Sequence, residues 1–274
     1  MAYYVGRLNL KPKIAKYLEI GKVGFLNRIM YFRDIISRTS FLVLIIFIFA
    51  QLWNHIFEGG GNGIAGLGAK KMIWYLVMTE SIILSMPSIQ SNIDEEVKSG
   101  NIAYLLNKPF HYLLYHFAIY LGEVLLRFPI TFLIGGSLAF ILVGGFDFDL
   151  LVLPYLLVSL VMAFTLNFCL VISIALTALW IEDTTPFFWI YQKFMFTVGG
   201  LLIPLDVFPE FVATGAKILP FNYILQGPAK LLVGFSPATF RYVLIGQFTW
   251  VIILGAMSQM IFHKGVKKLS VHGG

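Results

Sequence analysis

The chain has 274 residues, of which 58% are hydrophobic and 12% are charged. Soluble domains average about 45–50% apolar and about 25% charged residues, so this composition excludes a water-soluble globular protein. Six membrane spans of about 20 residues would use about 120 residues, which leaves short loops and one longer arm but no second globular domain. The single cysteine, Cys169, excludes an intrachain disulfide and a cysteine-based metal site.

The formal net charge of +6 is concentrated at the two ends of the chain. Eight of the 20 Lys and Arg residues precede the first apolar run, and three follow the last. Because basic residues favour the cytosolic side, both termini are expected in the cytosol, which requires an even number of spans. Six spans place 13 basic residues inside and four outside. No aromatic-basic recognition motif accompanies the charge, so nucleic-acid binding is not favoured.

Residues 1–38 form the first expected element, a cytosolic arm. Between Ile14 and Ile36, apolar residues recur at spacings of three and four, while Lys and Arg lie largely on the other faces. This pattern predicts an amphipathic, interfacial helix at the inner membrane surface. Two roles stay open, a passive anchor on anionic lipid and a grip on a cytosolic partner. The basic residues available for either role include Lys16, Arg28 and Arg33.

Six apolar runs with a helical pattern predict six transmembrane helices in an all-α domain over residues 39–262. The expected spans are residues 37–57, 72–89, 111–143, 150–180, 187–205 and 243–262. The third is about 50 Å long at 1.5 Å per residue, which exceeds a hydrocarbon core of about 30 Å, so its start should project into the cytosol. Pro129 is a candidate kink within it. A basic tail, residues 263–274, follows the last span on the cytosolic side.

Two connecting segments differ from ordinary loops. The inner segment 91–110, between spans two and three, is the most polar internal stretch of the chain. Span five is interrupted by Gly199 and Gly200 and closed by Pro204, so a broken or re-entrant element is expected there. The outer segment 206–240 that follows contains four prolines, which favour short helices that dip into the outer interface.

Polar residues inside the expected spans are costly and are candidates for function. Glu80, in span two, is expected to pair with Lys193 or Arg127 of another span, or to contact a substrate or a proton. Glu123 and Arg127 stand four residues apart in the order that favours an ion pair within a helix. Asn167 belongs to a small and polar face of span four, which either lines a translocation path or serves helix packing.

The sequence motifs indicate no catalytic constellation. Residues 135–139 approach a buried G-x-S-x-G nucleophile motif, but every histidine lies at a span end or outside the spans. Asp147 and Asp149 share one short outer turn, which indicates a solvated loop rather than an aspartyl dyad. No G-x-x-x-x-G-K-[ST] phosphate loop occurs, so the chain is not expected to hydrolyse ATP.

The order of these features resembles the permease subunits of ATP-binding-cassette (ABC) transporters of the type-2, exporter-like class. Three sets of residues carry the resemblance. They are Tyr31-Phe32-Arg33-Asp34 with Trp53 in span one; Glu96-Val97-Lys98-Ser99-Gly100-Asn101-Ile102-Ala103-Tyr104-Leu105-Leu106-Asn107-Lys108-Pro109 in the inner segment; and Gly199 to Leu205, Phe208-Pro209, Leu219-Pro220-Phe221 and Gly227-Pro228-Ala229 in the outer part.

The resemblance implies a mechanism in which a separate ATPase subunit, carrying ATP and Mg, docks on the inner segment. The helix around 94–106 is then the coupling helix. Its residues for contact with the ATPase are Asp94, Glu95, Glu96, Lys98 and Asn101, while Tyr104 and Leu105 would face the membrane domain. The arm 11–38 would brace the ATPase, and residues 182–186 would add a second contact.

The resemblance further implies two permeases, identical or sister subunits, facing each other in a bacterial-type plasma membrane. Closure of the ATPase pair would switch access across the membrane, with the broken span at Gly199 and Gly200 as a moving part. An amphipathic cargo exported outward is the favoured substrate class. Two alternatives stay open: a gradient-driven transporter or channel that uses Glu80 or Lys193, and a membrane enzyme.

Overall fold

The computed structural model describes residues 10–30, 32–58, 68–145 and 148–272, and every regular element in these ranges is a helix. The helices are α1 (Leu10–Met30), α2 (Phe32–Glu58), α3 (Ala69–Ser85), α4 (Ile89–Lys98), α5 (Asn101–Leu106), α6 (Tyr112–Val143), α7 (Leu153–Ala175), α8 (Ala178–Ile181), α9 (Thr185–Thr197), α10 (Glu210–Ile218), α11 (Pro220–Ile224), α12 (Gln226–Val233) and α13 (Pro237–His272). Short 3₁₀ turns, Leu150–Val152 and Leu205–Val207, precede α7 and α10.

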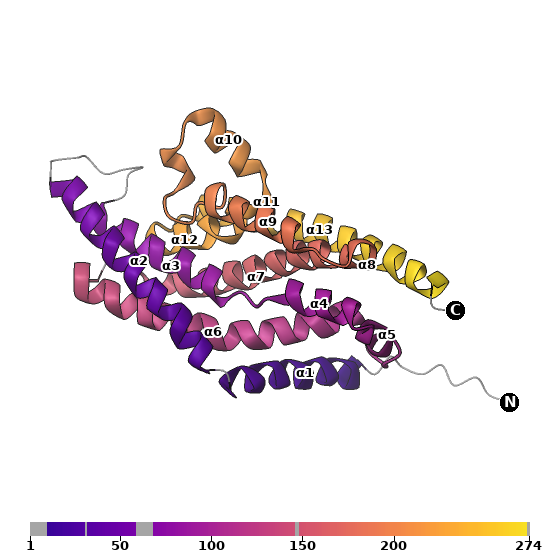
Figure 1. Ribbon diagram of the computed structural model, residues 1–274. Helices are drawn as coiled ribbons and strands as arrows, with labels where there is room; N and C mark the ends of the chain where they lie inside the picture. The colour runs from indigo at the N-terminus through magenta and orange to yellow at the C-terminus, as the bar shows by residue number, and fades with distance from the viewer. Residues whose placement is uncertain (1–9, 31, 59–67, 146–147, 273–274) are drawn as a thin grey trace.

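The long helices run alongside one another as an elongated bundle (Figure 1). α6 packs against α1, α2 and α3, and α7 packs most extensively against α13. In the described ranges five stretches are long and apolar enough to cross a membrane. They are Thr39–Ile56, Ala69–Lys98, Tyr112–Val143, Leu150–Ile181 and Pro237–Lys268.

The expected fifth span is not among these five stretches. Its helix, α9, has 13 residues and is therefore about 20 Å long, which is short of a hydrocarbon core of about 30 Å. The chain then turns at Gly200, whose φ of 72° lies in the left-handed region. Short helices α10, α11 and α12 follow before the last long helix. A sixth full span therefore stays a prediction.

The inner segment is a helical hairpin rather than a loop. α3 ends before Pro87, which lacks an N–H and disfavours helical geometry in the residue before it. α4 then continues to Lys98, and Gly100 turns the chain into α5 with a φ of 73°, a conformation that glycine adopts without steric cost. The tip formed by α4 and α5, the start of α1 and the end of α13 lie toward the same end of the molecule (Figure 1).

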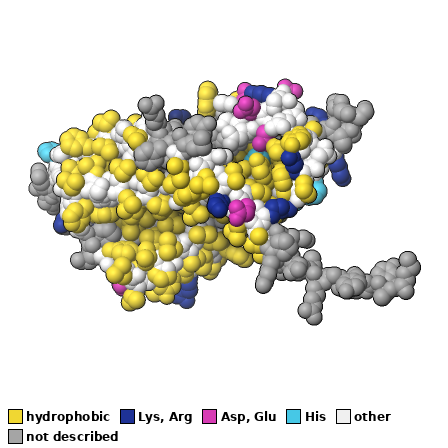
Figure 2. All heavy atoms as spheres, turned by 90° about the horizontal axis from the view of Figure 1, so that it is seen from below, with side chains coloured by type: hydrophobic (Ala, Val, Ile, Leu, Met, Phe, Trp, Pro, Cys, Tyr) yellow, Lys and Arg dark blue, Asp and Glu magenta, His cyan; other side chains and the backbone are white. Residues whose placement is uncertain are grey.

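The arm helix α1 packs lengthwise along the first half of α6, and glycines make the close contact. A Cβ atom on Gly122 of α6 would lie 2.0 Å from the carbonyl oxygen of Gly21, and one on Gly24 would lie 2.9 Å from that of Ile119. Apolar residues of the amphipathic pattern face outward, since Ile14, Leu18 and Ile29 are 57%, 68% and 46% exposed. Figure 2, seen from the side of α1, shows apolar side chains over most of this face, with most of the charged ones toward one end.

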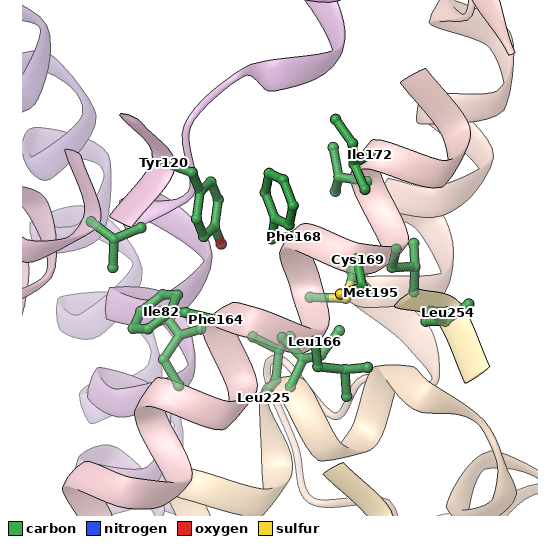
Figure 3. Packing of buried hydrophobic residues seen from close by; sticks show 14 of the residues in the cluster. Ile82, Tyr120, Phe164, Leu166, Phe168, Cys169, Ile172, Met195, Leu225 and Leu254 are labelled. Carbon is green, nitrogen blue, oxygen red and sulfur yellow. The ribbon is translucent and has the colours of Figure 1, made fainter. Parts of the chain in front are cut away.

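The main apolar core surrounds α7, which contacts helices from both halves of the chain. Figure 3 shows Tyr120 of α6 beside Phe168 of α7, with a ring-centroid distance of 5.6 Å. A second, smaller cluster joins α2, α3 and α6 around Leu42, Ile46 and Val77. α13 continues as one helix to His272, so the basic tail extends the last span without a break.

Candidate functional site

The outward face of the α4–α5 hairpin is charged and exposed. Glu95, Lys98 and Asn101 are exposed, and Tyr104 is 60% exposed with the Nζ of Lys108 at 4.3 Å from its ring centroid. The Nζ of Lys98 lies 3.8 Å from Asp183, an exposed ion pair that contributes little to stability. Tyr104 was expected to face the membrane domain, and this was wrong. Instead, Ile102 and Leu105 are the α5 side chains that pack against the main apolar core. They are three positions apart and therefore share one face of the helix.

Asp94 lies on the inward face of the hairpin, where it is 4% exposed. Its Oδ1 accepts a hydrogen bond from the Thr184 hydroxyl at 2.8 Å, and its Oδ2 accepts one from the Thr184 N–H at 3.2 Å. Gln90 also donates to this carboxylate. Thr184 directly precedes α9, so the Asp94 carboxylate lies at the N-terminus of this helix, where the helix dipole favours a negative charge. Asp94 therefore joins α4 to α9, and its burial corrects the expectation that it contacts the ATPase.

Glu96 also bonds within the chain. The Tyr112 hydroxyl donates to its Oε2 at 2.5 Å, and the Nε2 of His116 lies 3.3 Å from the same oxygen. Both partners belong to α6, and both are buried. Glu96 therefore ties α4 to α6, which leaves Glu95 as the carboxylate of α4 that faces outward.

A second charged group joins α1, α6 and the break after α3. Arg127 donates from Nη2 to Glu123 at 2.8 Å, which is the ion pair that the sequence predicts, and from Nη1 to the Met86 carbonyl at 3.3 Å. The Nε of Arg28 on α1 lies 3.8 Å from the same Glu123 oxygen. Arg127 thus stabilises a carbonyl beside Pro87, where the α-helical hydrogen bonds are interrupted.

Two of the three basic arm residues that the sequence selects, Arg28 and Lys16, contact the chain itself. Besides Arg28, Lys16 donates from Nζ to the Pro109 carbonyl at 2.6 Å. The side chain of Arg33 lies outside the described residues, as does Asp147 of the outer turn.

Asn167 joins three helices in the interior. Its Nδ2 donates to the Tyr120 hydroxyl at 2.9 Å, and its Oδ1 accepts a hydrogen bond from the Tyr191 hydroxyl. Tyr191 belongs to α9 and also lies 3.7 Å from the Met86 sulfur. On the same face of α7, Ser159 bonds to Gln247 of α13. The polar face of this span therefore serves helix packing at both positions.

A cavity of about 290 Å³ opens next to Asn167, between the α3–α4 break, α7 and α9. Its wall combines polar and apolar side chains. They include Met86, Asn167, Tyr191, Lys193, Phe196 and Leu201.

The turn after α9 is held by side chains from α3 and α12. The Tyr75 hydroxyl donates to the Gly200 carbonyl, and the Thr79 hydroxyl donates to the Leu201 carbonyl at 2.6 Å. The Leu205 N–H donates to the Gln226 Oε1 at 2.9 Å. Sequence reasoning selected the glycines but missed these three partners, because hydroxyl and amide side chains in apolar helices carry no spacing signal.

Glu80 does not form the expected pair. It is 2% exposed in α3, and it makes no ion pair or side-chain hydrogen bond within the described ranges. Lys193 is exposed on α9, and Arg127 is engaged with Glu123. In the same ranges no group of three or more His, Cys, Asp or Glu side chains could hold a metal ion.

Comparison with protein families gives a match over most of the chain. The family model described as "ABC-2 family transporter protein" matches residues 39–273, from the start of the first span to the end of the last long helix. No curated protein matches the chain.

Proposed function

Because this chain belongs to the ABC-2 transporter family, we propose that it is the permease subunit of an ATP-driven transporter whose ATPase is a separate subunit. ATP and Mg would be bound by that partner. The chain's own part would be to receive the ATPase movement and to convert it into a change of access across the membrane.

The observation that carries this proposal is the two-sided α4–α5 hairpin. Its outer face offers Glu95, Lys98 and Tyr104 to a partner, while its inner face is bonded to two other helices through Asp94 and Glu96. Because the inner face of the hairpin is bonded to two helices, a force applied to its charged outer face is transmitted to those helices instead of bending the hairpin. A push on the hairpin would therefore move α6 and α9 together.

The further path of that movement runs through α9. This helix begins at the Asp94–Thr184 link and ends at the turn around Gly200. Its middle contacts α7 through Tyr191 and Asn167 beside the cavity of about 290 Å³. Tilting α9 would change this cavity, whose mixed apolar and polar wall suits an amphipathic cargo exported outward. A second permease, identical or a sister subunit, would close the path on the exposed side of α9.

The test is purification of the tagged full chain from its native membranes in mild detergent, with mass spectrometry of the co-purifying proteins. We expect a P-loop ATPase. Glu95→Lys should reduce its recovery, whereas Glu210→Lys, a charge reversal at the exposed start of α10, should not. Purification of the chain without any ATPase, or equal recovery with both variants, contradicts the proposal.

One observation favours a second candidate, a gradient-driven carrier: the buried carboxyl of Glu80 has no ion-pair partner in the described ranges. Transport assays in membrane vesicles separate the two functions. Transport that persists after ATP depletion and is lost in Glu80→Gln supports the carrier, and loss of transport on ATP depletion supports the permease.

A further inference from the structure

Two apolar grooves follow the outer surface of α6 and meet. The first, of about 460 Å³, lies between α1 and α6 and is lined by residues such as Leu18, Phe25 and Leu114. The second, of about 410 Å³, lies between α6 and α7 and is lined only by apolar side chains, among them Phe132 and Leu157. Leu121 and Leu125 of α6 line both grooves, so the two form one channel along the helix.

The channel is open to the surroundings of the bundle. Leu125 and Leu133 are each 68% exposed, and Leu157 on the opposite wall is 52% exposed. Where such an open apolar groove lies within the membrane core, it contacts hydrocarbon rather than water, so its natural occupant there has the shape of a chain.

The position of the channel along α6 matches the depth expected for the inner leaflet. If the outer end of the hydrocarbon core is at Val143, a core of about 30 Å ends about 20 residues earlier, near Glu123. On the α6 side, the second groove from Leu125 to Leu133 then lies in the hydrocarbon of the inner leaflet. Its α7 wall begins at Leu153, three residues after the expected start of span four, so the groove continues toward the outer leaflet. The first groove, near Ala118, lies at the level of the lipid headgroups. From Ala118 to Leu133 the channel is about 22 Å long, compared with about 15 Å for one leaflet of the core.

A single basic side chain, Lys22, lines the headgroup end of the channel. It is largely exposed, and its contact with Glu19 is long, at 4.0 Å. The cytosolic leaflet carries anionic lipids, which attract basic residues near the membrane surface. The charge of Lys22 is therefore complementary to a lipid phosphate placed above the apolar channel.

We propose that this channel is a binding site for one anionic phospholipid of the inner leaflet, with an acyl chain along α6 past Leu121 and Leu125 and the headgroup at Lys22. The bound lipid would fill the space between α1, α6 and α7 and thereby fix the arm helix to the bundle. The proposal depends on membrane insertion alone, so its failure and a failure of the ATPase proposal are separate results.

The test uses the purified full chain, reconstituted with phosphatidylcholine that contains a small fraction of phosphatidylglycerol carrying a photoactivatable group on its acyl chain. Peptide mass spectrometry then locates the adducts. We expect the adducts in residues 114–133 of α6 and 153–161 of α7. In Lys22→Gln we expect about fivefold less labelling of these segments. This factor corresponds to about 1 kcal/mol per basic residue near an anionic surface. Lys264→Gln, an exposed lysine on α13, is the matched control and should label as the wild type does.

A second variant tests the apolar part. Leu121→Trp should fill the shared middle of the channel and lower the labelling, whereas Ile141→Trp, on the same helix and 78% exposed outside the channel, should not. Labelling spread evenly over α2, α6 and α13, or equal labelling with photoactivatable phosphatidylcholine, shows bulk lipid only and overturns the site. Cross-linking between two copies through Leu125→Cys in membranes overturns it as well, because the channel would then be an interface between protein chains.

Discussion

Replacing Gly200 by Ala tests how the turn after α9 is held, and Gly100 provides a matched control. Both glycines have nearly the same backbone geometry, with φ of 72° and 73°. Left-handed geometry costs a residue with a Cβ atom about 1–2 kcal/mol, so this part of the effect should be equal at the two positions. Their surroundings differ. A Cβ at Gly100 meets nothing within 4 Å, whereas one at Gly200 would lie 2.8 Å from the Gln226 Oε1 and 2.9 Å from the Tyr75 hydroxyl.

Displacing either buried polar group from its hydrogen bond lowers the free energy of unfolding by a further amount of about 1–3 kcal/mol. This additional loss arises only at Gly200. Since 1 kcal/mol corresponds to about 2–4 °C in Tm for a chain of this size class, Gly200→Ala should melt roughly 2–12 °C below Gly100→Ala. Tryptophan fluorescence of the purified proteins in one detergent, at one scan rate, measures the difference. Equal shifts for the two variants would refute the view that α3 and α12 hold the turn.

Three further predictions concern the polar groups of the site. Asp94→Asn should lower Tm, because the amide replaces a charge-assisted hydrogen bond from Thr184 worth about 1.5–3 kcal/mol. Under the proposed function it should also weaken the coupling of ATP hydrolysis to transport, and unchanged transport per ATP would contradict a coupling role for the contact between α4 and α9. Asn167→Leu should destabilise the chain by about 1–3 kcal/mol for each tyrosine hydroxyl left unpaired, and a wild-type Tm would show that the bridge is dispensable. Burial by itself would raise the pKa of Asp206, but hydrogen bonds and charge from Lys230 and Lys217 lower it on balance. Its contribution to stability is therefore present above the unfolded pKa of about 3.9 and is lost as the pH falls through the lowered folded pKa, so Tm of the wild type should fall more steeply below about pH 4 than that of Asp206→Asn.

The sequence by itself determined the class of the molecule. Its apolar runs, basic ends and glycine and proline positions predict an all-helical membrane protein, and the family resemblance that these features suggest is confirmed over residues 39–273. The Glu123–Arg127 pair was also predictable, because its partners are four residues apart on one helix. Local signals of this kind depend on neighbouring positions in the chain, which a sequence displays directly.

The contacts between distant segments were decided only by the tertiary structure. The charged residues 94–98 look equivalent in sequence, yet Asp94 and Glu96 point inward to Thr184 and Tyr112 while Glu95 faces out. Glu80 illustrates the converse, since two basic residues seemed available to it and the fold places neither one against it. The direction of a side chain follows from the rotation of its helix about the helix axis and from the neighbour that packs there. Both depend on how the whole bundle buries its apolar surface rather than on the spacing of residues along one segment.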